Sequence, residues 1–155
     1  MELFLIRHAI AEPGDDDDAR ALTPKGRKRF RQVVEALDAM GLRFDRVLHS
    51  PKRRAVETAE LLAPLTDGEL EVTSLLAAPP KEKLLTQLRG GALAVVGHEP
   101  HLSTLLAWLT VGEPEQGRAF LLKKGSVAAL AGEPGPGGMQ LVGLWSPGAL
   151  RRLRG

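Results

Sequence analysis

Three short polar segments in this chain each follow an apolar run, and together they carry side chains that can bind and attack an anion. Arg7-His8 ends the run that begins at Leu3. His49-Ser50 ends a second run, with Arg54 shortly after it, and His98 ends a third. Arginine presents a planar fork of donors that matches phosphate oxygens, and a neutral imidazole can act as a nucleophile or a base. These residue types indicate an anion site with a reactive nitrogen in it.

The apolar runs before these segments are typical of strands buried on both faces of a sheet. Such strands are predicted over Leu3–Ile6, Phe44–His49 and Ala92–Gly97. In an open α/β sheet, ligands bind just beyond the carboxyl ends of the strands, and parallel strands share one such edge. The two arginines and the histidines are therefore expected to converge there, beside the amide donors of helix N-termini. Such a pocket suits a phosphoryl group.

The segments between the strands have recognisable helix starts and ends. Thr23-Pro24 has the residue types of an N-cap and a first helical position, and Gly41 is placed to end that helix. Ser50-Pro51 repeats the start. Further helices are expected over Lys52–Leu62, over Lys81–Leu88 and after Pro100.

The last third of the chain is richer in strand patterns. Strands are expected over Leu70–Val72, Ala119–Leu122, Ser126–Leu130 and Met139–Trp145, before a basic tail at residues 149–154. Strands that alternate with helices and then a strand-rich end predict an α/β fold, a three-layer α/β/α sandwich around a mostly parallel sheet. No repeat or linker divides the 155 residues, so a single domain over residues 1–155 is expected.

The composition excludes several classes of protein. The chain has no cysteine, which excludes disulfides, thiolate metal sites and cysteine nucleophiles. No apolar run is long enough to cross a membrane and no leader precedes the first strand, so we expect a cytoplasmic protein without a membrane partner. Aromatic residues are 4% of the chain and tyrosine is absent, so base-stacking platforms are scarce and no nucleic-acid partner is expected.

Two runs of like charge have less specific interpretations. Asp15–Asp18 is expected to be solvated, because adjacent carboxylates cannot all point at one metal ion without a shaped loop. The basic cluster Lys25–Arg31 is interpreted as a solvated helix face, with attraction of an acidic partner as the alternative. His98 and His101 are three residues apart around a proline, whereas the zinc motif has histidines four apart on a helix. No metal site is predicted.

The polar segments also resemble the histidine phosphatase (phosphoglycerate-mutase-like) superfamily. The resemblance rests on Arg7-His8, on Ser-Pro-x-x-Arg-Ala-x-x-Thr-Ala at residues 50–59 and on Val-Gly-His-Glu-Pro at residues 96–100, in this order. Because no long insertion separates the second helix from the fourth strand, the chain is most similar to the SixA-like protein-phosphohistidine phosphatases. The resemblance implies a phosphoglycerate-mutase-like fold. Ala9 departs from the pattern, since most of the superfamily has glycine there.

Carried over residue by residue, the resemblance implies that His8 is the nucleophile and that Arg7, Arg54 and His98 form the catalytic phosphate pocket, with Ser50 also binding substrate. A neutral His8 would attack phosphorus to give a phosphohistidine that water hydrolyses. The two arginines and a protonated His98 would hold the equatorial oxygens in the transition state. Since these cations supply the charge, no metal and no other cofactor is expected.

A general acid is missing from its usual place in that superfamily. Phosphomonoesterases and mutases usually have a glutamate after the third strand, and this chain has Ser74–Ala78, without a carboxylate. A phosphoramidate nitrogen is readily protonated by solvent and needs such an acid much less than a sugar alkoxide does. The expected partner is therefore a phosphorylated protein, such as a histidine-phosphotransfer domain. Glu12, Glu99 or the Asp15–Asp18 run could still serve as the acid, which leaves a small phosphorylated metabolite open.

A rival interpretation from another class is a non-catalytic, regulatory phosphate-binding protein. The presence of both His8 and His98 argues against it. His49 and His101 are interpreted as structural residues near the site.

Overall fold

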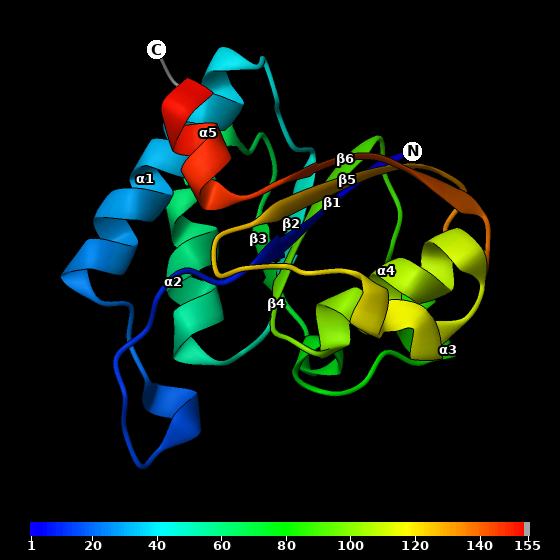
Figure 1. Cartoon of the computed structure of the whole chain (residues 1–155), viewed down its shortest axis with the longest axis horizontal. Helices are drawn as coiled ribbons and strands as arrows, with labels where there is room; N and C mark the ends of the chain where they lie inside the picture. Colours follow the sequence, from blue (N-terminus) through cyan, green and yellow to red (C-terminus); the bar gives the residue numbers. More distant parts are fainter. Residues whose placement is uncertain (154–155) are drawn as a thin grey trace.

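The described residues form a six-stranded sheet between two layers of helices (Figure 1). The structure is a computed structural model and describes residues 1–153. The strands lie side by side in the order β3-β2-β4-β1-β5-β6. Their bounds are β1 Glu2–Arg7, β2 Arg46–His49, β3 Leu70–Val72, β4 Ala92–Gly97, β5 Val127–Gly132 and β6 Met139–Trp145.

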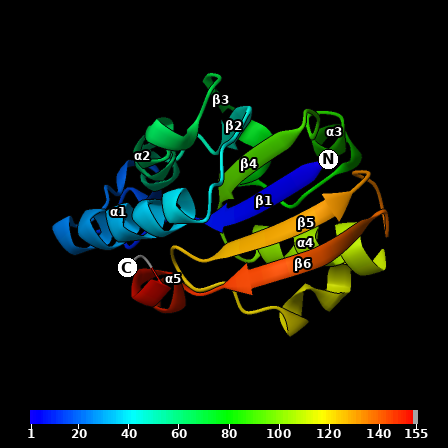
Figure 2. The same cartoon turned by 90° about the horizontal axis from the view of Figure 1, so that it is seen from above.

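The register of the parallel strands aligns the polar segments. β1 to β4 run parallel, whereas β5 is antiparallel to both β1 and β6, as the arrows in Figure 2 show. Arg7 of β1 lies opposite Gly97 of β4, and His49 of β2 lies opposite Val96. The three strands therefore end almost level and deliver the residues that follow them to one edge of the sheet, as the pattern predicted.

Helices cover both faces of the sheet. The α-helices are α1 Pro24–Ala39, α2 Arg53–Leu61, α3 Glu82–Leu85, α4 His101–Val111 and α5 Pro147–Leu153, and the 3₁₀ helices are η1 Asp17–Ala19, η2 Ala63–Leu65, η3 Ser74–Ala77 and η4 Pro114–Ala119. Figure 1 shows α1, α2 and α5 on one side of the sheet and α3 and α4 on the other. The predicted three-layer sandwich is confirmed. None of the helices in the described part has the length and apolar character that a bilayer crossing requires.

Alternate side chains of β1 enter two hydrophobic cores. Phe4 and Ile6 pack in the core under α1, α2 and α5, whereas Leu3 and Leu5 pack in the core under α3 and α4. A strand buried on both faces must be apolar at successive positions, which is why its sequence is a continuous run.

The predicted start and end of α1 are confirmed. Thr23 Oγ1 accepts a hydrogen bond from the Gly26 amide at 2.8 Å, and Gly41 follows the helix with φ of 77°. Gly26 leaves no room for a side chain, because a Cβ would lie 2.2 Å from the Ile10 carbonyl oxygen. This close contact brings the first turns of α1 against the loop that follows His8.

The strand predicted over Ala119–Leu122 is wrong. Both edges of β5 are already paired, with β1 and β6, so the sheet has no place for another strand beside it. Ala119 instead ends η4, and the Leu122 carbonyl accepts a hydrogen bond from Arg7 Nη1 at 2.8 Å. The segment before β5 therefore positions the side chain of Arg7.

Three other predicted elements differ in extent. The helix expected over Lys81–Leu88 is confined to α3, because Gln87 and Leu88 donate to carbonyls three residues back and form tighter turns. α2 begins at Arg53 without Ser50 as its N-cap. The predicted basic tail includes α5, and Arg154 lies outside the described residues.

Candidate active site

His8 lies one residue beyond β1 and is buried, with 5% of its surface exposed. Its backbone amide donates to the Gly97 carbonyl at 3.0 Å, which ties it to β4. The ring nitrogen Nδ1 lies 2.7 Å from the Ala9 carbonyl oxygen. Because a carbonyl oxygen can only accept, Nδ1 carries the proton and Nε2 of the neutral ring keeps its lone pair. The fold thus leaves Nε2 as the ring nitrogen of His8 that is able to act as a nucleophile.

Burial keeps His8 neutral. Burial, together with the positive charges of Arg54, Arg7 and Lys124, lowers the pKa of His8 from 6.5 to about 4, although the hydrogen bond to the Ala9 carbonyl acts in the opposite direction. An imidazole with this pKa is unprotonated near neutral pH, as nucleophilic attack requires.

His98 faces His8 across the site. The two ring centroids are 5.2 Å apart. His98 Nε2 lies 2.7 Å from the Ser50 hydroxyl oxygen, and that oxygen also accepts the Lys52 amide proton at 3.2 Å. The Ser50 hydroxyl proton is thus available to donate to Nε2, and in this arrangement the ring proton of His98 lies on Nδ1.

The substrate-free site disfavours the proton that we expect on His98 in the transition state. Burial, with smaller contributions from His8, Arg54 and Lys52, lowers the pKa of His98 from 6.5 to about 3. His98 is therefore neutral near pH 7, and it offers a phosphate oxygen a neutral Nδ1–H donor.

Arg7 and Arg54 complete what we call the phosphate cradle, formed by Arg7, His8, Arg54 and His98. Arg7 Nε, Arg54 Nε and His98 Nδ1 are buried and have no hydrogen-bond partner among the described residues. Among those residues, one other buried side-chain polar atom lacks a partner, Gln87 Oε1. Buried donors are almost always paired in folded proteins, so three unpaired ones in one cradle are suited to bind an anionic ligand.

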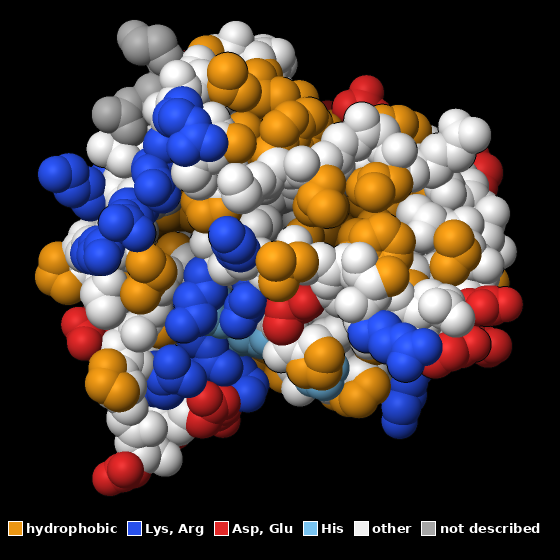
Figure 3. Space-filling view, in the orientation of Figure 1, with side chains coloured by type: hydrophobic (Ala, Val, Ile, Leu, Met, Phe, Trp, Pro, Cys, Tyr) orange, Lys and Arg blue, Asp and Glu red, His pale blue; other side chains and the backbone are white. Residues whose placement is uncertain are grey.

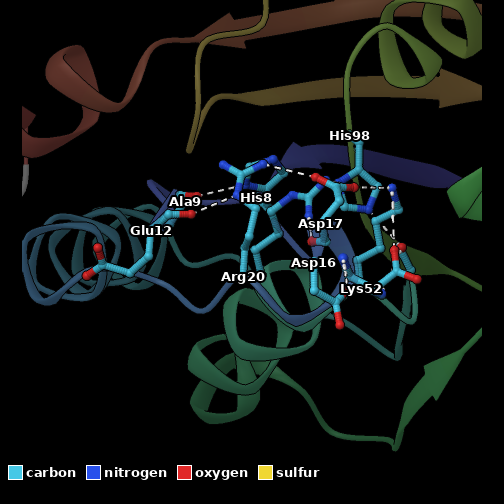
Figure 4. A network of polar contacts seen from close by, with 11 residues as sticks. His8, Ala9, Glu12, Asp16, Asp17, Arg20, Lys52 and His98 are labelled. Atoms are coloured by element: carbon cyan, nitrogen blue, oxygen red, sulfur yellow. Dashed lines mark hydrogen bonds and ion pairs between the residues drawn. The ribbon is translucent and has the colours of Figure 1, made fainter. Parts of the chain in front are cut away.

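Asp17 of the acidic run lies against the cradle. Arg54 Nη1 donates to the Asp17 carbonyl at 2.7 Å, and Arg54 Nη2 lies 3.3 Å from Asp17 Oδ2. Lys52 Nζ binds the same carboxylate at 2.7 Å, as Figure 4 shows. Hydrogen bonds from Lys52 and Arg20 hold the pKa of Asp17 well below its usual range. The run was expected to be solvated, and for Asp17 that description is incomplete: its side chain is half exposed but anchored over the site.

The two candidate general acids lie differently. Figure 4 shows the Glu12 side chain pointing away from His8. Glu99 accepts hydrogen bonds from the Ser103 amide at 2.9 Å and from its hydroxyl, at the start of α4. Glu99 also influences Arg7 electrostatically. Neither carboxylate forms a hydrogen bond to a cradle residue among the described ones, and Glu99 acts on the cradle only through its charge on Arg7.

Sequence reasoning assigned no role to three residues that support the cradle. Lys52 and Lys124 act electrostatically on His98 and His8 respectively. Thr58 Oγ1 accepts the Ala9 amide proton at 3.0 Å and donates to the Arg54 carbonyl at 2.7 Å. The signal for Thr58 was its position four residues after Arg54, on the same face of α2. Within residues 1–153, no group of three or more histidine or carboxylate side chains is placed to hold a metal ion.

A family model described as "Histidine phosphatase superfamily (branch 1)" matches residues 3–78. This range contains Arg7, His8, Ser50 and Arg54 and ends before His98.

Two curated proteins show the range of similarity. An uncharacterised protein of Picosynechococcus sp. is 34% identical over 143 residues, which cover 84% of each chain. The mitochondrial serine/threonine-protein phosphatase PGAM5 of Rattus norvegicus is 34% identical over 73 residues, 46% of this chain and 25% of that protein. The chain therefore spans most of the first relative and about a quarter of the second.

Among solved structures, the protein histidine phosphatase SixA complexed with tungstate is similar over nearly the whole chain. The TM-score is 0.83, with 25% sequence identity, and the match covers 97% of this chain and 99% of that one. The predicted phosphoglycerate-mutase-like, SixA-like architecture is confirmed, and these similarities support a phosphatase activity.

Proposed function

The chain belongs to branch 1 of the histidine phosphatase superfamily, and from this membership and the cradle we propose that it is a phosphatase that acts through a phosphohistidine on His8. We further propose that its substrate is phosphohistidine on a protein. The observation that carries the proposal is the set of three unpaired buried donors, Arg7 Nε, Arg54 Nε and His98 Nδ1, around a neutral imidazole.

The proposed first step is attack by His8 Nε2 on phosphorus. The Nε2–P bond forms as the bond from phosphorus to the substrate nitrogen breaks, and the departing imidazole takes a proton from solvent. Arg7, Arg54 and His98 donate to the equatorial oxygens, which carry the charge of the transition state. The Ala9 carbonyl holds the proton on Nδ1 of His8 and stabilises the positive ring while the phosphoryl group is attached.

In the second step, water attacks phosphorus and the P–Nε2 bond breaks. Inorganic phosphate leaves, and His8 returns to the neutral form with its proton on Nδ1. The cycle needs no charge beyond that of the cradle, so we propose that it runs without a metal or another cofactor.

The positions of the carboxylates support a phosphoramidate substrate. Glu12 points away from His8, and Glu99 is engaged by Ser103. The Asp17 carboxylate lies against the cradle, but hydrogen bonds from Lys52, Arg20 and Arg54 hold its pKa well below its usual range, so it has no proton to donate near neutral pH. An alkoxide leaving group, such as that of a sugar phosphate, needs a proton from the enzyme, whereas a departing imidazole nitrogen does not.

The test uses two measurements on the full chain. A substrate with labelled phosphorus should leave an acid-labile, base-stable label on the protein, and His8→Ala should carry none. His101→Gln, which changes a histidine at the same edge of the sheet, should keep the label. Turnover should be faster for a phosphohistidine protein than for phosphoserine or a sugar phosphate. Faster turnover of the sugar phosphate would contradict the proposed substrate, and labelling of His8→Ala would contradict the proposed nucleophile.

A further inference from the structure

A pocket adjoins the phosphate cradle, and of its lining only Arg7 and Ala9 take part in the mechanism above. Its volume is about 490 Å³, and it lies between the loop after His8, the first turns of α1, the turn before β5 and the start of α5. Its lining includes five cationic side chains and, within the described residues, no carboxylate. We call it the basic pocket; its cations are Arg7, Arg29, Lys123, Lys124 and Arg151.

The floor of the basic pocket is apolar. Phe30 and Val33 of α1 are almost fully buried beneath it, and Pro147 forms part of the wall. A ligand that fills the pocket therefore needs an apolar part to cover this floor and anionic groups to meet the rim.

The basic pocket is continuous with the phosphate cradle through Arg7. Arg7 lines the pocket and belongs to the cradle, and Lys124 lies close enough to His8 to act on its charge. A molecule with its phosphoryl group at His8 can thus reach the basic pocket with the groups next to that phosphoryl.

We propose, on the basis of the proposed function, that the basic pocket binds an acidic segment with apolar side chains, close to the phosphohistidine in the substrate protein. The charge of the rim is complementary to such a segment. Figure 3 shows Lys and Arg side chains spread along the side of the molecule that carries α1 and α5, down to the pale blue histidine.

One arginine of the basic cluster on α1 lines the basic pocket and the others do not, which allows a matched pair of variants. Arg27 is paired with the buried Glu57, and Arg29 lines the basic pocket. Arg31 is exposed and is not among the lining residues. Arg29→Gln and Arg31→Gln therefore remove the same charge from the same helix, inside and outside the pocket.

The first experiment measures binding without catalysis. A fluorescently labelled, unphosphorylated peptide of Glu, Asp and Leu is titrated with the full chain, beside a peptide with Gln and Asn in place of the acids. The acidic peptide should bind more tightly, and less so at high salt. Arg29→Gln should weaken binding about threefold, the effect expected of one exposed charge, and Arg31→Gln should not. Equal binding of both peptides, or equal effects of the two variants, would overturn the proposal.

The second experiment separates this proposal from the proposed function. Arg29→Gln should raise KM for an acidic phosphohistidine peptide about threefold, with kcat and the turnover of free phosphohistidine unchanged. An equal change for both substrates would refute the pocket's role and leave the phosphatase proposal standing. Absence of any phosphohistidine turnover, with selective peptide binding intact, would refute the proposed function and leave the pocket standing. Lys123→Gln serves as a second variant if Arg29→Gln is unstable.

Discussion

Replacement of Thr58 by valine should slow the reaction at His8, although Thr58 contacts His8 only through the Ala9 peptide. Thr58 is fully buried, and its hydroxyl accepts the Ala9 amide proton at 3.0 Å. The Ala9 carbonyl in turn holds Nδ1 of His8 at 2.7 Å. Valine has nearly the same shape, so Thr58→Val leaves no cavity and removes the hydroxyl alone. The Ala9 amide is then buried without a partner, and its peptide is free to turn.

The expected changes in stability and in kcat follow from the loss of the hydrogen bond between the Thr58 hydroxyl and the Ala9 amide. An unpaired buried donor costs about 1–3 kcal/mol, which should appear in the free energy of unfolding by urea. Loss of alignment of His8 should lower kcat about 10- to 100-fold, since a misplacement of roughly 1 Å has such effects. KM should change little, because Arg7, Arg54 and His98 still bind the phosphoryl group.

The control is Thr58→Ser, which keeps the hydroxyl and should restore most of kcat. Steady-state kinetics with a phosphohistidine substrate give kcat and KM separately. If Thr58→Val lost stability but kept the wild-type kcat, Thr58 would be structural alone and the positioning argument would be refuted. A serine variant as slow as the valine variant would show that the hydroxyl is not the cause.

Three further predictions concern charge. The pKa values of His8 and His98 in the folded protein are lowered to about 4 and about 3, so below pH 6.5 the unfolded chain binds protons that the folded chain does not. The free energy of unfolding should therefore fall by up to about 2 kcal/mol per histidine between pH 6.5 and 5. Urea unfolding of a His8→Asn, His98→Asn double variant should lose this dependence on pH. Asp17→Asn removes an anion that competes for Arg54, so calorimetry at low salt should show about two- to fivefold tighter binding of inorganic phosphate; weaker binding would mean that Asp17 is needed to hold Arg54 in place. Glu57→Gln removes a mostly buried charge that is paired with Arg27 and Arg53. It should lower the free energy of unfolding by about 1–3 kcal/mol, measured by thermal or urea denaturation. An unchanged unfolding midpoint would show that these ion pairs contribute nothing to stability.

Much of the fold could be predicted because its signals are local. A strand buried on both faces must be apolar throughout, and a helix start needs a side chain that accepts a free amide, as at Thr23. The convergence of Arg7, Arg54 and His98 also followed from local signals, since parallel strands share a carboxyl edge. The failure at Ala119–Leu122 has a non-local cause, because its apolar pattern suits a strand but the sheet has no unpaired edge beside β5.

The sequence by itself determined which residues meet at the edge of the sheet, since residue types and strand ends are properties of the chain alone. The tertiary structure decided their chemical state: which nitrogen of His8 carries the proton, that His98 is neutral, and that Asp17 reaches Arg54. It also decided that Arg29 lines a pocket while Arg31 does not. These properties depend on burial and on hydrogen bonds between segments far apart in the chain, which no local pattern encodes.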